Sequence, residues 1–202
     1  MGKLIIVNGS PRAPRSNSRK YTECFKLYWQ GETEEYFVTV KKYAEAIEKI
    51  RTAGRVLLVF PLYADGIPVT LMEFLKELER VAQGTSVTVH IIINCGFFEP
   101  KQNEVALDIL KEYCRRCGFN VGSVLSIGSG EAFPTTPLMF FVKRKLKKLA
   151  RAISLGKNRV FKVTLPLTKR MFLRASTTYW TNYGKKNNIT SEQMNTMKIE
   201  GE

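Results

Sequence analysis

The chain has one histidine and few acidic residues: 18 Asp and Glu stand against 32 Lys and Arg, for a formal net charge of +14. No apolar stretch is long enough to cross a bilayer, and the amino terminus lacks the charged, apolar, small-residue progression of a signal peptide. We therefore expect a cytoplasmic protein without a transmembrane segment. With 202 residues and 44% hydrophobic content, the chain can bury a sizeable core, and we expect one domain with an extension.

Metal ligands and catalytic histidines are also scarce. The four cysteines, Cys24, Cys95, Cys114 and Cys117, are scattered, which fits a reducing compartment. Cys114 and Cys117 form one C-x-x-C pair, but a structural zinc site needs a second pair, and a redox dithiol belongs at a strand-to-helix turn rather than near a helix end. His90 lies inside an apolar run. We therefore expect a core histidine rather than a member of a Ser-His-Asp arrangement.

Two nucleotide-binding fingerprints are missing. No G-x-G-x-x-G follows the first apolar run, and no G-x-x-x-x-G-K-[ST] occurs, so neither the usual tightly bound NAD nor a P-loop nucleotide is supported. The pair Gly128-x-Gly130 is too little to argue from. A phospho-acceptor receiver domain requires acids where this chain has Asn8-Gly9 and Phe60-Pro61.

Short apolar runs alternate with segments of helical periodicity. The expected strands are Lys3–Val7, Glu35–Val40, Val56–Phe60, Val87–Ile93 and Asn120–Ile127. The expected helices cover residues 18–29, 41–52, 69–82 and 102–116, the last with Val105, Ile109, Leu110 and Tyr113 facing inward. Strands and helices at this spacing predict a parallel sheet with right-handed crossovers and helices on both faces. In such sheets ligands bind beyond the carboxyl ends of the strands.

The first of these strands ends in a loop suited to phosphate. The run 8–18 is rich in Gly, Ser, Pro, Arg and Asn and then becomes a helix. Backbone N–H groups, hydroxyls, the Asn17 amide and a helix N-terminus can donate to a phosphate there, while Arg12 and Arg15 add charge. The alternative is an ordinary strand-to-helix loop capped by Ser16 or Ser18.

Two more unusual loops, 61–68 and 94–100, follow the third and fourth expected strands. All three loops fall at the carboxyl edge of the predicted sheet, and this clustering is the strongest functional signal in the chain. The carboxylates at that edge, Asp65, Glu99 and Glu131, are single and lack obvious partners. If the protein is an enzyme, a cofactor therefore supplies the chemistry.

These residues resemble a known family. Asn8-Gly9-Ser10-Pro11-Arg12 followed by Ser16-Asn17-Ser18 resembles the phosphate loop of the flavodoxin-like NADPH-dependent FMN reductases and NAD(P)H quinone reductases. Pro61-Leu62-Tyr63 with Ile67-Pro68 resembles their second flavin loop, and Asn94-Cys95-Gly96-Phe97 falls where they place the third. The resemblance covers about residues 3 to 130.

The resemblance implies an α/β, flavodoxin-like sheet of five parallel strands in the order 2-1-3-4-5, which binds FMN non-covalently. It implies that the phosphate contacts Ser10, Arg12, Ser16, Asn17 and Ser18. It places the isoalloxazine ring against two groups of residues, namely Pro61, Leu62, Tyr63, Ala64, Asp65 and Gly66, and Asn94, Cys95, Gly96 and Phe97. No catalytic side chain is obligatory in this family: NAD(P)H is the co-substrate that reduces the flavin, which reduces a small acceptor such as a quinone or a flavin.

Members of this family are commonly homodimers with the flavin near the interface, so the resemblance also implies a homodimer. The chain departs from the family in its third loop, where Phe97 and Phe98 are bulky. These two residues either narrow access to the ring or serve in plain packing.

The basic residues concentrate in the last third. From Pro137 onward, 15 Lys and Arg stand against 3 acids. Residues 137–153 predict an amphipathic helix with a Lys/Arg face. Residues 160–165 suit an edge strand or extended arm, and residues 171–183 have helical spacing that favours packing on the main body or a dimer partner. We expect a flavodoxin-like domain over 1–156 and an extension over 157–202.

The basic face is most simply a solvated surface. The alternative function that it leaves open is a non-catalytic binding module that holds an anionic partner, either nucleic acid or an anionic membrane surface.

Overall fold

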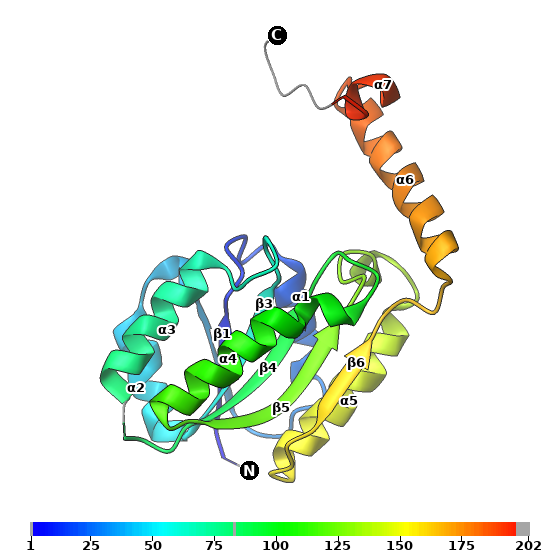
Figure 1. Ribbon diagram of the computed structural model, residues 1–202. Coiled ribbons are helices and arrows are strands. Elements are labelled where there is room, and N and C mark those ends of the chain that lie inside the picture. The colour runs from blue at the N-terminus through cyan, green and yellow to red at the C-terminus, as the bar shows by residue number, and fades with distance from the viewer. Residues whose placement is uncertain (1, 83, 197–202) are drawn as a thin grey trace. The chain divides into compact units, whose positions relative to one another are not determined.

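A computed structural model describes residues 2–82 and 84–196 and shows a six-stranded parallel sheet in the order β2-β1-β3-β4-β5-β6 (Figure 1). The strands are β1 (Leu4–Asn8), β2 (Thr33–Phe37), β3 (Arg55–Pro61), β4 (Thr88–Asn94), β5 (Asn120–Ile127) and β6 (Val160–Val163). The inner strands β1 and β3 are buried along nearly their whole length. Their continuous apolar runs suit strands that are covered on both faces.

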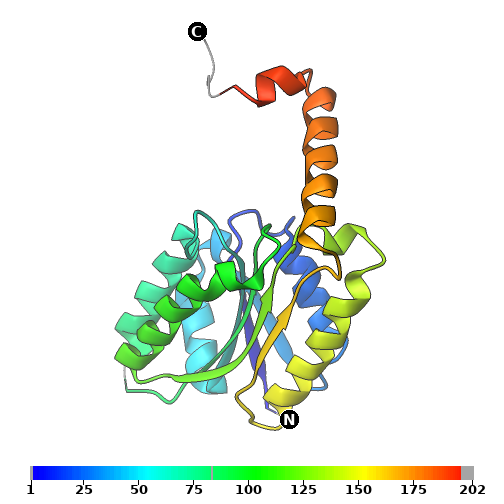
Figure 2. The same cartoon turned by 45° about the vertical axis from the view of Figure 1, so that its right-hand side comes forward.

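Helices cover both faces of the sheet (Figure 2). On one face lie α2 (Tyr43–Ala53), α3 (Val69–Ala82) and α4 (Glu104–Cys117), and on the other lie α1 (Asn17–Lys26) and α5 (Met139–Ser154). Three short 3₁₀ segments, η1 (Val38–Val40), η2 (Pro100–Asn103) and η3 (Phe133–Thr135), lie in the connections. The predicted flavodoxin-like α/β sheet, with its order 2-1-3-4-5, is confirmed, and β6 extends it beyond the five predicted strands.

The inward face predicted for α4 is right for Leu110, which is fully buried, and for Tyr113, which packs against the core, but wrong for Val105 and Ile109. Val105 is 60% exposed and Ile109 48%, while the buried stripe is formed by Ala106, Leu107, Leu110, Cys114 and Cys117. Hydrophobicity alone favoured the two β-branched residues. The close approach of a helix to a sheet instead selects a small alanine and two compact thiols.

The crossovers among the five predicted strands are right-handed, as expected, whereas the last crossover, from β5 to β6, has the opposite hand. Helices α3 and α4 join strands that advance across the sheet toward β5, and they lie on one face. Helix α5 joins β5 to the next strand in the same direction, yet it lies on the other face beside α1. The β5–α5–β6 unit is therefore left-handed, a rare arrangement. It lets the apolar stripe of α5 cover the half of that face which α1 leaves open.

His90 is a core histidine, as expected. It is 4% exposed, and its Nδ1 accepts a hydrogen bond of 2.9 Å from the Ser123 N–H. The register between β4 and β5 shifts between Val89 and Ile91, so this side chain replaces a ladder bond. A Cβ at Gly122 would lie 2.2 Å from His90 Nδ1, which explains why glycine stands opposite the ring.

Contacts divide the chain into two compact units, Met1–Leu165 and Pro166–Glu202. Strand β6 pairs with β5, so the division falls after β6, whereas the predicted boundary at residues 156/157 falls before it. The second unit consists of α6 (Lys169–Lys186) and α7 (Ser191–Met194). Both helices have threonine N-caps, and α7 has a full capping box. Among the residues described, no helix is long and apolar enough to span a membrane.

Candidate functional site

Hydrogen bonds within the first loop, between β1 and α1, and from this loop to β3 fix its conformation. The Gly9 N–H donates to the Val59 carbonyl at 2.9 Å, and the Arg12 N–H donates to Ser10 Oγ at 3.3 Å. Ser16 is the N-cap of α1, and its Oγ accepts from the Arg19 N–H at 3.2 Å. Ser16 therefore caps α1, as the alternative interpretation of this loop expected. It leaves the rest of the helix start available for a ligand.

The start of α1 is an electropositive donor site. In the part of the chain that the structure describes, the N–H groups of Asn17 and Ser18 have no hydrogen-bond partner, as is usual in a first helical turn. Arg12, Arg15 and Lys20 line the same cavity and form no ion pair with a described residue. Two free amides, a helix dipole and three free cations together favour an anion.

The second loop contains a tight, strained turn. Tyr63 and Gly66 exchange backbone hydrogen bonds of 3.1 and 2.9 Å, and the two central residues, Ala64 and Asp65, have φ of 45° and 55°. Two successive left-handed residues that are not glycine store strain of about 1–3 kcal/mol each. Such strain often persists at functional sites because the surrounding structure enforces it.

Asn94 forms hydrogen bonds to the start of α1 and to the end of β3. It ends β4, is 4% exposed, and donates from Nδ2 to Ser18 Oγ at 3.2 Å and to the Phe60 carbonyl at 3.0 Å. The next residue, Cys95, is buried, and burial raises the pKa of its thiol to about 11. This thiol is therefore neutral at pH 7. The Gly96 N–H has no partner within the described residues and stands at the cavity wall.

A fourth loop, Gly128–Glu131 after β5, completes the wall. A Cβ at Gly128 would lie 2.5 Å from the Phe98 carbonyl, so only glycine allows the third and fourth loops to approach so closely. The Tyr21 hydroxyl donates to the Gly130 carbonyl at 2.5 Å. Glu131 then lines the cavity.

The segment after β6 supports both of these loops. The Thr164 hydroxyl donates to the Phe98 carbonyl, and its oxygen lies 3.1 Å from Ser129 Oγ. The Gly128 N–H donates to the Val163 carbonyl at 2.9 Å. The sixth strand therefore supports the loops of the site as well as extending the sheet.

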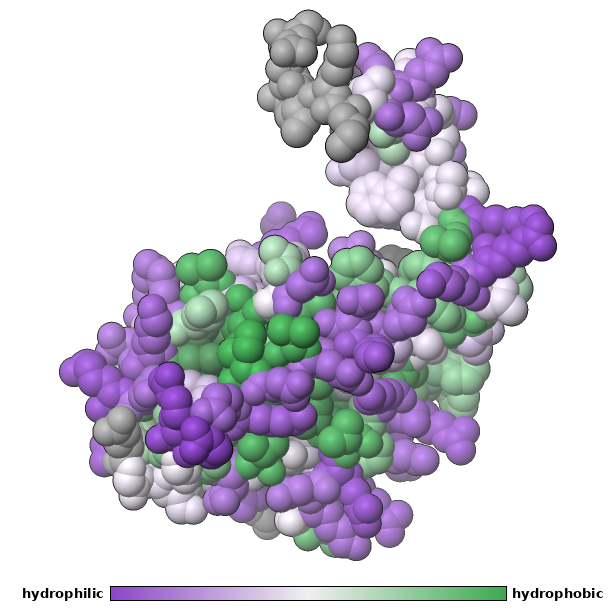
Figure 3. Space-filling model, in the orientation of Figure 1, coloured by the Kyte–Doolittle hydropathy of each residue, from purple (hydrophilic) through white to green (hydrophobic). Residues whose placement is uncertain are grey.

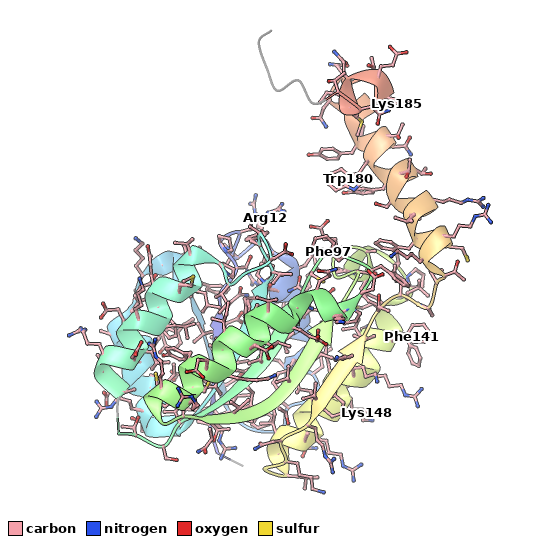
Figure 4. All side chains as sticks on the ribbon, in the orientation of Figure 1. Arg12, Phe97, Phe141, Lys148, Trp180 and Lys185 are labelled. Carbon is pink, nitrogen blue, oxygen red and sulfur yellow. The ribbon has the colours of Figure 1, made fainter. Side chains whose placement is uncertain are left out.

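The loops enclose a cavity of about 510 Å³ at the carboxyl edge of the sheet, where Figure 4 labels Arg12. Eleven of the predicted site residues line it together: Ser10, Arg12, Ser16, Asn17, Ser18, Pro61, Leu62, Tyr63, Asn94, Cys95 and Gly96. Four predicted residues do not line it, namely Ala64, Asp65, Gly66 and Phe97. The turn points Ala64 and Asp65 into solvent, and Phe97 is 51% exposed.

Six lining residues were not among the predicted cofactor-binding residues, although Arg15 was recognised as a source of charge and Glu131 as a carboxylate at this edge of the sheet. These are Pro14, Arg15, Arg19, Lys20, Glu23 and Glu131. Arg19 and Glu23 are paired at 2.9 Å, which cancels their charges locally. Arg19, Lys20 and Glu23 follow the N-cap within the next two turns, so helical spacing from Ser16 could have found them. The sequence placed Glu131 at this edge of the sheet, but its position on the cavity wall depends on how closely the last two loops approach.

FMN fits the residues that are present. Ligand cavities measure about 300–1,000 Å³, and this one falls inside that range. One end offers free amides and cations for a phosphate, and the other offers the side chains of Leu62 and Tyr63 and the backbone of Gly96 for a flat ring. Described residues contain no group of three or more potential metal ligands.

Comparison with known proteins gives a likeness in structure only. No protein-family model and no curated protein matches the sequence. An NAD(P)H:quinone oxidoreductase from Methanothermobacter marburgensis superposes with a TM-score of 0.62 at 13% identity, covering 75% of this chain and 96% of its own. An FMN-dependent NADH-azoreductase from Bacillus anthracis, solved in complex with FMN, gives 0.53 at 14% identity, covering 78% and 100%. A flavodoxin from Streptococcus pneumonia TIGR4 gives 0.56 at 13%, covering 76% and 98%.

The chain thus has the flavodoxin-like fold, and its structural neighbours include NAD(P)H quinone reductases and azoreductases. At these identities the likeness establishes the fold alone.

Proposed function

We propose that the cavity binds FMN and that the protein is an FMN-dependent NAD(P)H oxidoreductase that reduces a small acceptor such as a quinone or a flavin. The observation that supports this most is the convergence of the three predicted loops on one cavity with an anion site at one end. The likeness to quinone reductases and to an FMN-bound azoreductase agrees with it.

The FMN phosphate would bind at the start of α1. The Asn17 and Ser18 amides would donate to it, and Arg12 and Arg15 would neutralise its charge. Ser10 and Ser16 can contribute directly as well, because each Oγ accepts a hydrogen bond from the backbone and keeps its own O–H to donate to the phosphate. They fix the loop that aims the free donors.

The flavin ring would lie against Leu62, Tyr63 and Gly96. When bound, FMN supplies the hydride and electron chemistry, so no side-chain acid is required. The unpartnered Gly96 N–H is available to stabilise negative charge on a reduced ring. Tyr63 is 42% exposed and can flank the face of the ring.

Flavin titration tests the proposal. The protein should bind FMN with a change in the visible flavin bands and oxidise NAD(P)H when an acceptor is present. Replacing Arg12 and Arg15 together by Ala should weaken FMN binding by about 10- to 100-fold, because two charge-assisted contacts are lost. Riboflavin lacks the phosphate, so its affinity should not change in the same variant. Equal losses for both ligands would place the phosphate elsewhere, and no flavin binding by the wild type would refute the proposal.

A homodimer forms part of the proposal. Exposed apolar residues lie on α3 and α4, including Val69, Met72, Val105 and Ile109. Figure 3 shows green, hydrophobic surface over this face. An apolar patch of this kind often marks an interface. The wild type should sediment as a dimer, and replacing Ile109 with Arg should shift the protein toward monomer in sedimentation velocity. A variant that remains as dimeric as the wild type would place the interface elsewhere.

A further inference from the structure

Helix α5 carries an uncompensated cationic face. Between Glu131 and Glu192 the sequence contains no acidic residue and fourteen Lys and Arg. Six of these cations belong to α5, and all are outside the core: Lys143, Arg144, Lys145, Lys147, Lys148 and Arg151. None forms an ion pair with a described residue, whereas α2, α3 and α4 each pair surface cations with acids on the same helix. The positive charge of this face is therefore free to attract a partner.

Two aromatic side chains lie on the same exposed face. Phe140 is 62% exposed and Phe141 38%, and their rings contact each other at 5.7 Å between centroids. Spacings of three and four residues place Phe140 in one row with Arg144, Lys147 and Arg151. The opposite side of α5 is buried on the sheet. Figure 4 shows Phe141 and Lys148 both projecting outward from α5.

We propose that this face of α5, defined by its six cations with Phe140 and Phe141, binds the surface of a bilayer that contains anionic lipids. Interfacial binding combines attraction between cations and anionic headgroups with insertion of a few apolar side chains, and both elements are present here. The inference does not depend on the proposed function, because neither phenylalanine nor any of the six cations lines the cavity.

The chemistry of α5 favours a membrane over two other partners. A second copy of this face would bring six cations against six, which opposes association. Single-stranded nucleic acid binds in grooves where aromatic rings serve as stacking platforms, whereas these rings stand on a convex helix and pack edge to face on each other. Exposed phenylalanines beside cations suit insertion between lipid headgroups.

Helix α6, considered by itself, has similar chemistry. Its cations are Lys169, Arg170, Arg174, Lys185 and Lys186, and it has no acid. Tyr179, Trp180 and Tyr183 are each about half exposed and contact one another. Tyrosine and tryptophan are typical of membrane–water interfaces. A second helix in the basic third of the chain thus fits the same kind of surface.

Vesicle co-sedimentation of the full-length protein tests the proposal. The protein should pellet with vesicles of phosphatidylcholine mixed with phosphatidylglycerol, fail to pellet with phosphatidylcholine alone, and be released as the salt concentration rises. Lys147→Glu with Lys148→Glu should weaken binding by about 20-fold or more, since each cation near an anionic surface contributes roughly fivefold. Phe140→Ser with Phe141→Ser should weaken it by about tenfold or more through lost apolar burial.

Matched variants on the opposite face of the sheet serve as controls. Lys76→Glu with Lys111→Glu makes the same charge change on α3 and α4, and Val81→Ser removes a partly exposed apolar side chain. Both control variants should bind vesicles nearly as the wild type does, and circular dichroism should show every variant folded.

Three results would overturn the proposal. The first is no binding to the anionic vesicles. The second is an equal loss in the α5 and control variants, which would indicate a response to net charge alone. The third is tight, salt-sensitive binding to single- or double-stranded DNA that is abolished by the α5 charge variant, with vesicle binding absent. FMN binding is measured separately, so failure here leaves the flavin proposal standing.

Discussion

At the scale of single residues, His90 couples stability to pH. Burial, aided by Arg55, lowers the pKa of His90 from 6.5 to about 4, so the native state holds a neutral ring that accepts the Ser123 N–H. An unfolded histidine takes up a proton below pH of about 6.5, whereas the native one does not until about 4. The free energy of unfolding should therefore fall as pH drops through this window, by up to about 3 kcal/mol.

Urea unfolding at a series of pH values checks this. In His90→Gln, whose side-chain oxygen can still accept from Ser123, the part of the slope between about pH 6.5 and 4 that comes from the histidine should vanish. If the free energy of unfolding of His90→Gln falls with pH as steeply as that of the wild type, the effect comes from carboxylates instead.

A side chain at Gly122 should destabilise the fold. Because an added Cβ would lie 2.2 Å from His90 Nδ1, we expect Gly122→Ala to lower the free energy of unfolding by about 1–3 kcal/mol through overpacking. Adding Gly122→Ala to a His90→Ala background should cost far less, because the clashing ring is gone. Additive losses in this double-mutant cycle would contradict the structure.

Individual site residues were predictable where their role is local. Arg12, Asn17 and Tyr63 stand in loops whose composition is unusual, and the structure brings them to one cavity. Glu131 was expected at the same edge only as an isolated carboxylate, because its place on the cavity wall depends on two glycine-mediated loop contacts between strands far apart in sequence. The phosphate role predicted for Ser16 could not be separated from capping, since the same hydroxyl suits both.

At the scale of elements, the strained turn of the second loop invites a stabilising change. A two-residue turn with left-handed central residues is best served by Asn-Gly, whereas this chain has Ala64-Asp65. We expect Ala64→Asn with Asp65→Gly to raise the free energy of unfolding by about 1 kcal/mol, measured by urea denaturation. A decrease would show that the native side chains make interactions which outweigh the strain.

The hydrophobic periodicity of the sequence predicted which segments are helices and which are strands. It predicted the ends of these elements and their buried faces less well. The limits predicted for α3 and β5 match the structure because Pro68 and Gly118 flank these elements closely. The face of α4 was misassigned in part, at Val105 and Ile109, because Ala106 and two cysteines carry little hydrophobic signal yet pack tightly. The hand of the last crossover was not predictable at all, since local sequence does not state which face of the sheet remains uncovered.

At the scale of the whole molecule, the division after Leu165 predicts that the first unit is self-sufficient. A chain ending at Leu165 keeps all six strands and their core, so its Tm in calorimetry should stay within about 2 °C of that of the full chain. Its FMN affinity should also be unchanged. A fall in Tm of more than about 5 °C would show that α6 and α7 bury core surface of the first unit.

Strand β6 also protects the edge of the sheet against aggregation. It spans four residues, and it pairs with four of the eight residues of β5. Long unpaired strand edges recruit strands from other chains, while short edges that carry lysine, here Lys162, resist this. A molecule that lost β6 would present the apolar second half of β5 as a template, and would be expected to aggregate edge to edge before it lost its native core.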